Sequence, residues 1–260
     1  MKIEDLRSSL AAAYQILAFL QMDDLTYTHL SLRVPDGLSL GMKQSSDIEH
    51  RAGREQNAGT QSYLIYPFGY LFREVTPECL LRVSFEGEVL EGSEYQYNKT
   101  GYIIHSAIYK ARPEVNAVFH LHTTAGVAVS AQSQELLPLS QFSFHFYNRL
   151  SYHNYNALAL EPEIHGSEMA RDLGQNFAMI LRNHGTLTCG KTIQEAFFYA
   201  YYLEQACKVQ CAALAGLGAS GGELVIPSRE VCEQAAQDMR AFEPDLGLRD
   251  WLALRRVLKV

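Results

Sequence analysis

Two histidines separated by one residue lie in the apolar stretch of residues 116–124. His120 and His122 alternate there with apolar side chains. Because successive side chains of a β-strand point to opposite faces, this spacing predicts a strand that carries both imidazoles on one face. A second apolar stretch, residues 177–185, delivers His184 just before a glycine that permits a sharp turn. The chain therefore offers three imidazoles at the ends of two predicted strands.

Three neutral imidazoles with one open position are a common ligand set for a catalytic zinc or a similar divalent ion. A pair of alternating histidines taken alone is more often a surface or structural feature. The third histidine, at the end of a second strand, favours a metal site. We therefore predict that His120, His122 and His184 bind one divalent metal ion per chain. Zinc is the expected ion, with manganese and iron as alternatives.

Several further segments accompany these histidines and make residues 5–217 resemble the class II aldolase/adducin family. The matching segments are residues 66–69, 85–92, 105–113, 120–123, 182–185 and 192–206. The resemblance implies an α/β/α fold that assembles as a tetramer with active sites between subunits. It also implies a divalent ion on three histidines that binds the oxygens of an enediolate. As a Lewis acid the ion stabilises negative charge while a C–C bond beside a carbonyl breaks or forms.

The chain departs from the fuculose-phosphate type of aldolase at the catalytic positions. Gly101 stands where those aldolases carry the glutamate that acts as acid and base, and glycine cannot transfer a proton. His29 stands at the position of their phosphate-binding asparagine, and Phe68 replaces a threonine that donates a hydrogen bond. Phe142 occupies a position where a tyrosine is expected. These versions look more like the adducin head and its bacterial relatives, so we do not expect a standard sugar-phosphate aldolase.

Without that glutamate, another group has to carry the proton in any lyase reaction. The candidates are Lys99, His29, Tyr102, His145 and His153. For each of them, surface exposure or core packing is the plain alternative. Thr123 and Asn183 adjoin the metal histidines in the sequence and are expected to orient the imidazoles by hydrogen bonding.

Two functions of different classes remain open. In the first, the protein is a metal-dependent lyase of the aldolase type that acts on a small hydroxy or keto carbonyl compound without a phosphate, within carbohydrate metabolism. In the second, it is a non-catalytic, adducin-like oligomerisation or binding module that keeps the fold and the metal site. Stoichiometric metal with an open, water-filled coordination position would favour the first.

The composition sets the outer limits. A chain of 260 residues fits one large α/β domain or a domain with an appendage. A formal net charge of −7 disfavours nucleic acid and membrane surfaces as partners. No apolar run approaches the ~18 residues of a membrane span, and the N-terminus lacks the layout of a signal peptide. Five cysteines outside paired motifs fit a reducing cytoplasm.

The remaining pattern predicts the elements that position the site. The expected helices cover residues 3–22, 101–111, 125–131, 167–174, 192–217, 228–242 and 248–260. The expected strands cover residues 27–34, 62–66, 80–85, 89–90, 116–124, 177–183 and 186–189. Strands and hairpins outnumber simple βαβ units, so we predict a three-layer α/β/α fold with a central, mostly antiparallel sheet.

Three stretches lack a clear period or lie beyond the matched segments. Residues 35–60 are interpreted as a flap or an irregular hairpin. Residues 138–165 are rich in aromatic side chains, which are expected in the core, at a subunit interface or along a pocket wall. We divide the chain into a metal-binding domain, residues 1–217, and a C-terminal helical tail, residues 218–260, that packs on the domain or on a neighbouring subunit. A homo-oligomer, most simply a tetramer, is the expected assembly.

Overall fold

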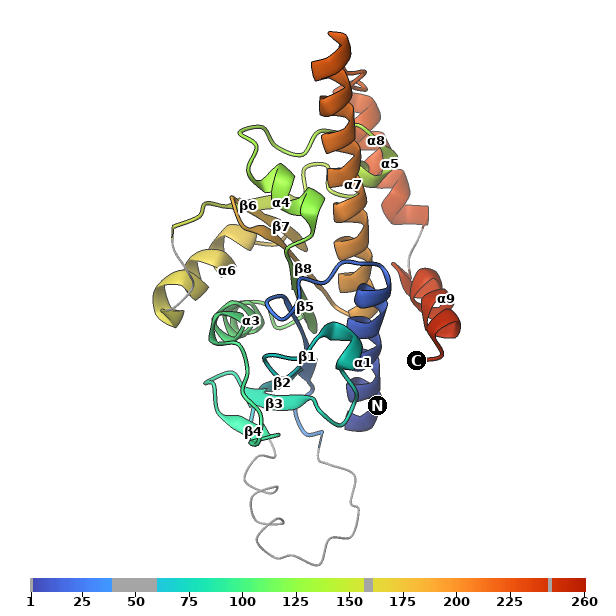
Figure 1. The fold of residues 1–260 in the computed structure, drawn as a ribbon. Coiled ribbons are helices and arrows are strands. Elements are labelled where there is room, and N and C mark those ends of the chain that lie inside the picture. Colours follow the sequence, from blue (N-terminus) through green and yellow to red (C-terminus); the bar gives the residue numbers. More distant parts are fainter. Residues whose placement is uncertain (1, 39–59, 157–160, 243–244) are drawn as a thin grey trace, which may run out of the picture.

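The computed structural model describes residues 2–38, 60–156, 161–242 and 245–260 (Figure 1). The flap interpreted at residues 35–60 falls almost entirely outside these described residues. The strands are β1 (His29–Val34), β2 (Ser62–Ile65), β3 (Leu81–Ser84), β4 (Val89–Glu91), β5 (Ala117–Leu121), β6 (Leu150–His153), β7 (Ala178–Leu181) and β8 (Gly185–Gly190). They form one open sheet in the order β4-β3-β2-β1-β5-β8-β7-β6.

Every neighbouring pair of these strands is antiparallel except β6 with β7, which is parallel. The helices are α1 (Ile3–Phe19), α3 (Lys99–Ala111), α4 (Thr124–Ser130), α5 (Gln141–Phe144), α6 (Ser167–Leu173), α7 (Ile193–Ser220), α8 (Arg229–Phe242) and α9 (Leu248–Leu258). A short 3₁₀ turn, η1 (Phe72–Glu74), and a π-helical turn, η2 (Pro162–Gly166), complete the described elements. None of the helices in the described part of the chain is long and apolar enough to cross a membrane.

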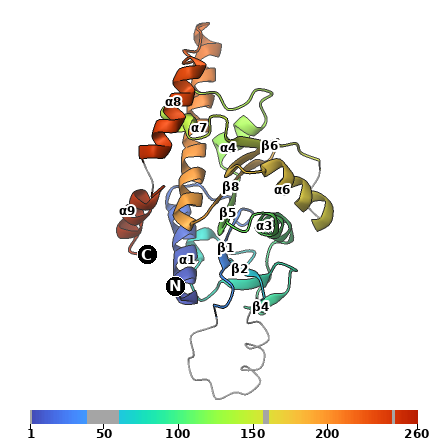
Figure 2. The ribbon, with the colours of Figure 1, turned by 180° about the vertical axis from the view of Figure 1, so that it is seen from behind.

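The helices cover both faces of the sheet. Figures 1 and 2 show α1 and α7 on one face and α3 with α6 on the other. The strands between them are almost fully buried, with every residue of β2, β3, β5, β7 and β8 inside. The predicted α/β/α layers with a mostly antiparallel sheet are therefore confirmed.

The C-terminal tail folds back on its own chain where α9 lies. Helix α9 packs against α1 and α7, and the ring of Trp251 lies 5.9 Å from that of Phe197. The division of the chain at residue 217 remains a prediction, but helix α7 runs past that point through Gly216 and Gly218. The helix ends at Ser220 and is capped by Gly221, which adopts the left-handed conformation with a φ of 68° that glycine accommodates without strain.

The edge strand β6 has no counterpart among the sequence-based expectations. It is only four residues long and pairs with one neighbour, with Leu150 opposite Ala178 and His153 opposite Leu181. A strand this short leaves too few residues for an alternating pattern to emerge from the aromatic-rich segment around it. Its parallel pairing matters for function, because it brings the C-terminal end of β6 to the edge of the sheet where His184 lies.

Candidate metal centre

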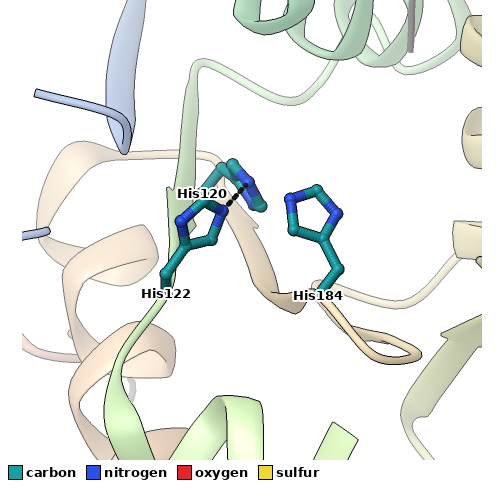
Figure 3. Close-up of side chains that lie close together, drawn as sticks. All are labelled: His120, His122 and His184. Carbon is teal, nitrogen blue, oxygen red and sulfur yellow. Dashed lines mark hydrogen bonds between the residues drawn. The ribbon is translucent and has the colours of Figure 1, made fainter. Parts of the chain in front are cut away.

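The structure brings together three histidines that lie up to 64 residues apart in the chain. His120 lies in β5, His122 follows that strand directly, and His184 occupies the turn between β7 and β8. One nitrogen from each ring lies within 4.8 Å of the others, and Figure 3 shows the three rings facing a common point. A tetrahedral zinc with Zn–N bonds of about 2.0–2.1 Å would separate its ligand nitrogens by roughly 3.4 Å, which fits this spread.

The turn that presents His184 depends on two backbone features. Asn183 adopts a left-handed φ of 56°, and its N–H donates to the carbonyl of Ser130 at 3.1 Å. A Cβ on Gly185 would lie 2.5 Å from the carbonyl oxygen of Leu121, so only glycine allows β8 to approach β5 this closely. The turn therefore holds the third imidazole at the end of β5.

The hydrogen bonds around His120 and His122 fix which nitrogens carry protons. Nδ1 of His120 lies 3.0 Å from the carbonyl oxygen of Thr186, and Nδ1 of His122 lies 2.9 Å from Oδ2 of Asp24. A carbonyl oxygen and an ionised carboxylate can only accept hydrogen bonds. Both Nδ1 atoms are therefore the protonated ones in the neutral rings, which leaves both Nε2 atoms with free lone pairs.

These two Nε2 atoms face each other at 2.9 Å, along the dashed line in Figure 3. Two lone pairs at this distance repel each other unless a proton or a metal cation lies between them. Burial, followed by the neighbouring His29, His122 and His184, holds the pKa of His120 well below its usual range. His120 is therefore held neutral, and the converging nitrogen donors fit a metal cation.

The surroundings keep the third ring neutral as well. Burial, followed by the charges that His122 and His153 would carry, lowers the pKa of His184 to about 4. Solvent still reaches the cluster, because 22% of the His122 side chain is exposed. The exposed ring of Tyr155 lies 6.2 Å from His184. The cluster is thus a set of accessible nitrogen donors at an open edge of the sheet.

A second group of imidazoles lies beside the triad on the same face of the sheet. His29 is directly opposite His120 in the pairing of β1 with β5, and their ring centroids are 5.0 Å apart. Nδ1 of His29 lies 2.8 Å from Nε2 of His105 on α3. His105 in turn hydrogen-bonds Ser31, which lies 2.8 Å from the hydroxyl of Tyr109. We call these four residues, His29, His105, Ser31 and Tyr109, the buried chain.

The five candidates for proton transfer are scattered by the fold. His29 lies beside the triad, and His153 lies at the same edge with its Nδ1 2.7 Å from Oδ2 of Asp172. Lys99 is exposed at the start of α3, and Tyr102 donates a hydrogen bond to the carbonyl of Phe85. The ring of His145 packs edge-on against Phe198 and tilted against Tyr202 of α7, on the opposite face of the sheet. Only His29 and His153 share the face and the edge of the three histidines.

The two residues expected to orient the imidazoles do not contact them by hydrogen bonds in the described part of the chain. The hydroxyl of Thr123 is buried without a partner there, and Asn183 is exposed and shapes the turn through its backbone. Asp24 and the Thr186 carbonyl orient the rings instead. The expectation for Thr123 and Asn183 used sequence adjacency, whereas side chains next to a ligand in a strand or tight turn point away from it.

Sequence reasoning missed Asp24 and most of the buried chain. Asp24 precedes β1 in an irregular segment and reaches His122 across 98 residues of sequence, so no local pattern marks it. His105 begins one of the segments that carry the family resemblance, and His29, Ser31 and Arg33 alternate with apolar residues in β1. That alternation could have placed a polar face of β1 against α3 and beside the histidine strand.

A search of protein families matches residues 8–211 to the class II aldolase and adducin N-terminal domain. A Pseudomonas aeruginosa protein, named provisionally as a class 2 aldolase, is 39% identical over 256 residues, covering 97% of this chain and 88% of its own. The chain belongs to the class II aldolase and adducin family. The resemblance inferred from the sequence is thereby confirmed.

Solved structures and the adducins are also similar to this chain. An aldolase II superfamily protein from Pseudomonas syringae superposes with a TM-score of 0.81 at 37% identity, covering 100% of this chain and 94% of that one. An L-fuculose 1-phosphate aldolase from Glaciozyma antarctica gives a TM-score of 0.69 at 27% identity, with coverage of 94% and 92%. Rat alpha-adducin is 34% identical over 82% of this chain, which corresponds to only 26% of the adducin.

Proposed function

We propose that the protein is a divalent-metal-dependent lyase of the aldolase type that acts on a small hydroxy or keto carbonyl compound without a phosphate. The observation that carries this proposal is the pair of Nε2 lone pairs of His120 and His122, which converge at 2.9 Å. Membership of the class II aldolase family supports it. Neutral imidazoles that converge on one point contribute little to stability and are well suited to bind a cation.

In this proposal His120, His122 and His184 bind the ion, with zinc favoured and manganese or iron as alternatives. When bound, the ion supplies a Lewis acid that polarises the carbonyl of the substrate. Asp24 and the Thr186 carbonyl keep the rings of His122 and His120 in the tautomer and orientation that binding requires. His29 and His153 are the groups of this chain placed to hold or exchange protons beside the ion.

The preference for a substrate without a phosphate rests on the altered catalytic positions. Gly101 carries no carboxylate, His29 replaces the phosphate-binding asparagine, and Phe68 offers no hydroxyl and is 43% exposed. Loss of a general acid and base alone costs about 10²–10⁴-fold in rate. We expect turnover of fuculose 1-phosphate to lie at least that far below ordinary aldolase rates, and a coupled assay that found ordinary rates would refute this part of the proposal.

The metal itself is tested by titration. Protein freed of metal by chelation is expected to take up one zinc per chain in a single tight step, measured by calorimetry and by elemental analysis after gel filtration. Cobalt in place of zinc should give the visible absorption of a four-coordinate site with imidazole ligands. Protein that binds no ion at neutral pH would rule out the lyase mechanism.

A non-catalytic, adducin-like module is the alternative function. The 34% identity to alpha-adducin and the glycine at position 101 favour it. The two functions differ in the open coordination position. A metal-loaded protein whose cobalt spectrum changes on adding small hydroxy or keto acids supports the lyase, whereas a saturated, unresponsive site supports the module.

The proposal includes a homotetramer in the cytoplasm, with the metal pocket near a subunit boundary. The exposed rings of Tyr155 and Phe142 and the apolar end of α7, which buries no side chain beyond Gln210 among those described, support an oligomer. Sedimentation at micromolar concentration should give about four times the chain mass of 29.2 kDa. A single species at the mass of one chain would contradict it.

A further inference from the structure

Gly101 is a glycine whose backbone does not require one. It lies inside helix α3 with ordinary helical geometry, where glycine costs about 1 kcal/mol relative to alanine. A Cβ at this position would lie 2.9 Å from Cδ2 of His29 and 3.0 Å from its Cγ and Nε2. The imidazole of His29 therefore occupies the volume in which any side chain at position 101 would begin.

The ring of His29 cannot easily move aside. It is 1% exposed, and its Nδ1 is held at 2.8 Å by His105, which is itself completely buried and bonded to Ser31. Tyr109, the end of the buried chain, is fixed between Ser31 and the core ring of Phe85, which stacks on it at 5.6 Å. Since Nδ1 is engaged, Nε2 is the nitrogen of His29 that remains to meet a ligand.

The buried chain can supply a proton at that nitrogen without any charged group. These contacts allow two tautomers, and in one of them the hydroxyl of Tyr109 donates to Ser31, Ser31 donates to Nδ1 of His105, and Nε2–H of His105 donates to Nδ1 of His29. In that tautomer each group donates once, and the remaining hydrogen of His29 is on Nε2, in the ring whose centroid lies 5.0 Å from that of His120.

We propose that His29 and Gly101 form an exchange pair, in which the imidazole takes the place of the family's carboxylate and donates a hydrogen bond to an anionic oxygen of the ligand at the triad. This inference rests on the proposed metal centre. A divalent ion on three neutral imidazoles, with no carboxylate at position 101, keeps its full positive charge. The ligand class that fits best is a small hydroxy or keto acid whose carboxylate supplies the missing negative charge.

The binding test uses oxalate, an unreactive dicarboxylate, with the zinc-loaded full-length protein in a calorimeter. His29→Phe keeps a ring of similar size but removes the donor. Because a hydrogen bond to a charged group is at stake, we expect about 10- to 100-fold weaker oxalate binding while zinc affinity changes less than about threefold. His145→Phe, which changes a half-buried histidine on the other face of the sheet, is the matched control and should leave oxalate binding unchanged.

A spectroscopic signature separates this role from mere packing. In protein labelled with ¹⁵N at histidine, oxalate should shift the Nε2 resonance of His29 in the zinc-loaded wild type and leave that of His145 in place. Unchanged oxalate affinity in His29→Phe, with zinc retained, would overturn the inference and leave the metal centre standing. A wild type that binds no zinc would overturn both.

The steric half of the pair is tested by a double-mutant cycle that does not depend on metal. Gly101→Ala should lower the thermal unfolding temperature of the otherwise native protein, because the new methyl group overlaps the ring. In a His29→Ala background the same change should be neutral or stabilising, since alanine is the better helix former. Equal effects of Gly101→Ala in both backgrounds would overturn the exchange pair.

Discussion

The triad and the buried chain lie side by side on one face of the sheet, but the hydrogen bonding of their imidazole nitrogens differs. In the buried chain each of the four side chains, from His29 to Tyr109, hydrogen-bonds another of the four. In the triad Nδ1 of His120 and Nδ1 of His122 contact the Thr186 carbonyl and Asp24, and their Nε2 atoms face each other at 2.9 Å. The first arrangement leaves only Nε2 of His29 for a ligand, whereas the second directs its inner nitrogens toward a common point.

This difference suggests that the buried chain supports the fold, whereas the triad binds the metal ion. Buried polar groups with satisfied hydrogen bonds fix a structure, whereas converging lone pairs cost free energy until a cation arrives. We therefore expect substitutions in the triad to change metal affinity with little effect on folding. Substitutions deep in the buried chain should change stability with little effect on the metal.

The largest expected effect is on the metal affinity of His122→Ala. Removing one of three ligands should weaken zinc binding by more than about 100-fold, beyond the 10- to 100-fold typical of groups that only orient a ligand. Because the side chain of His122 is partly exposed, the free energy of unfolding of the metal-free protein should change by about 1 kcal/mol or less. Competition with a coloured chelator measures the affinity, and wild-type affinity in this variant would remove His122 from the site.

The opposite pattern is expected for His105→Leu. The substitution leaves His29 and Ser31 without their shared partner in the core and should destabilise the protein by about 3 kcal/mol, while zinc affinity stays within about threefold. Urea unfolding of the metal-free protein measures the loss. His105→Gln, which can still hydrogen-bond, is the control and should lose less. A loss of zinc affinity comparable to that of His122→Ala would show that the two clusters act as one.

Substitution of Asp24 tests whether metal binding by the triad requires the hydrogen bond to Nδ1 of His122. Asp24→Ala frees Nδ1 of His122, so the ring loses its fixed tautomer, and zinc affinity should fall about 10- to 100-fold. Asp23→Ala removes the neighbouring exposed carboxylate and serves as the control for net charge. If both variants bind zinc equally, Asp24 acts only through its charge.

A further expected effect is a dependence of stability on pH in the metal-free protein. The pKa values of His184 and His29, about 4 and about 3, lie below the ordinary 6.5 of an unfolded histidine. The unfolded state therefore binds more protons as pH falls from 6.5, so stability is full above that pH and decreases toward pH 4. Urea unfolding between pH 7.5 and 4.5 should show this decrease.

A control separates the two clusters from the rest of the protein in this pH series. The pKa of His145 is also lowered to about 4, by burial and then by Arg149, but it lies on the other face of the sheet. His145→Gln should keep most of the decrease. Stability that stays flat or rises on acidification would show that the clustered histidines are not held neutral.

The sequence by itself determined the layers and the identity of the triad. The alternation around His120 and His122 and the apolar run that ends at Gly185 are local patterns, set by the period of a strand and by the freedom of glycine. The resemblance of residues 5–217 to class II aldolases identified the family, because motifs and their order can be read directly from the sequence. Glycine at position 101 was visible too, as the absence of a carboxylate.

Only the tertiary structure decided what surrounds the triad. Asp24 reaches His122 across 98 residues, and His29 meets His105 across 76, so both contacts depend on how β1, β5 and α3 pack. Thr123 and Asn183, adjacent to the ligands in sequence, hydrogen-bond none of the three imidazoles. The role of Gly101 also depends on the fold, because a Cβ at this position would lie 2.9 Å from Cδ2 of His29. Spacing along a chain sets the direction of a side chain, but the partner it meets is set by elements that fold against it from elsewhere.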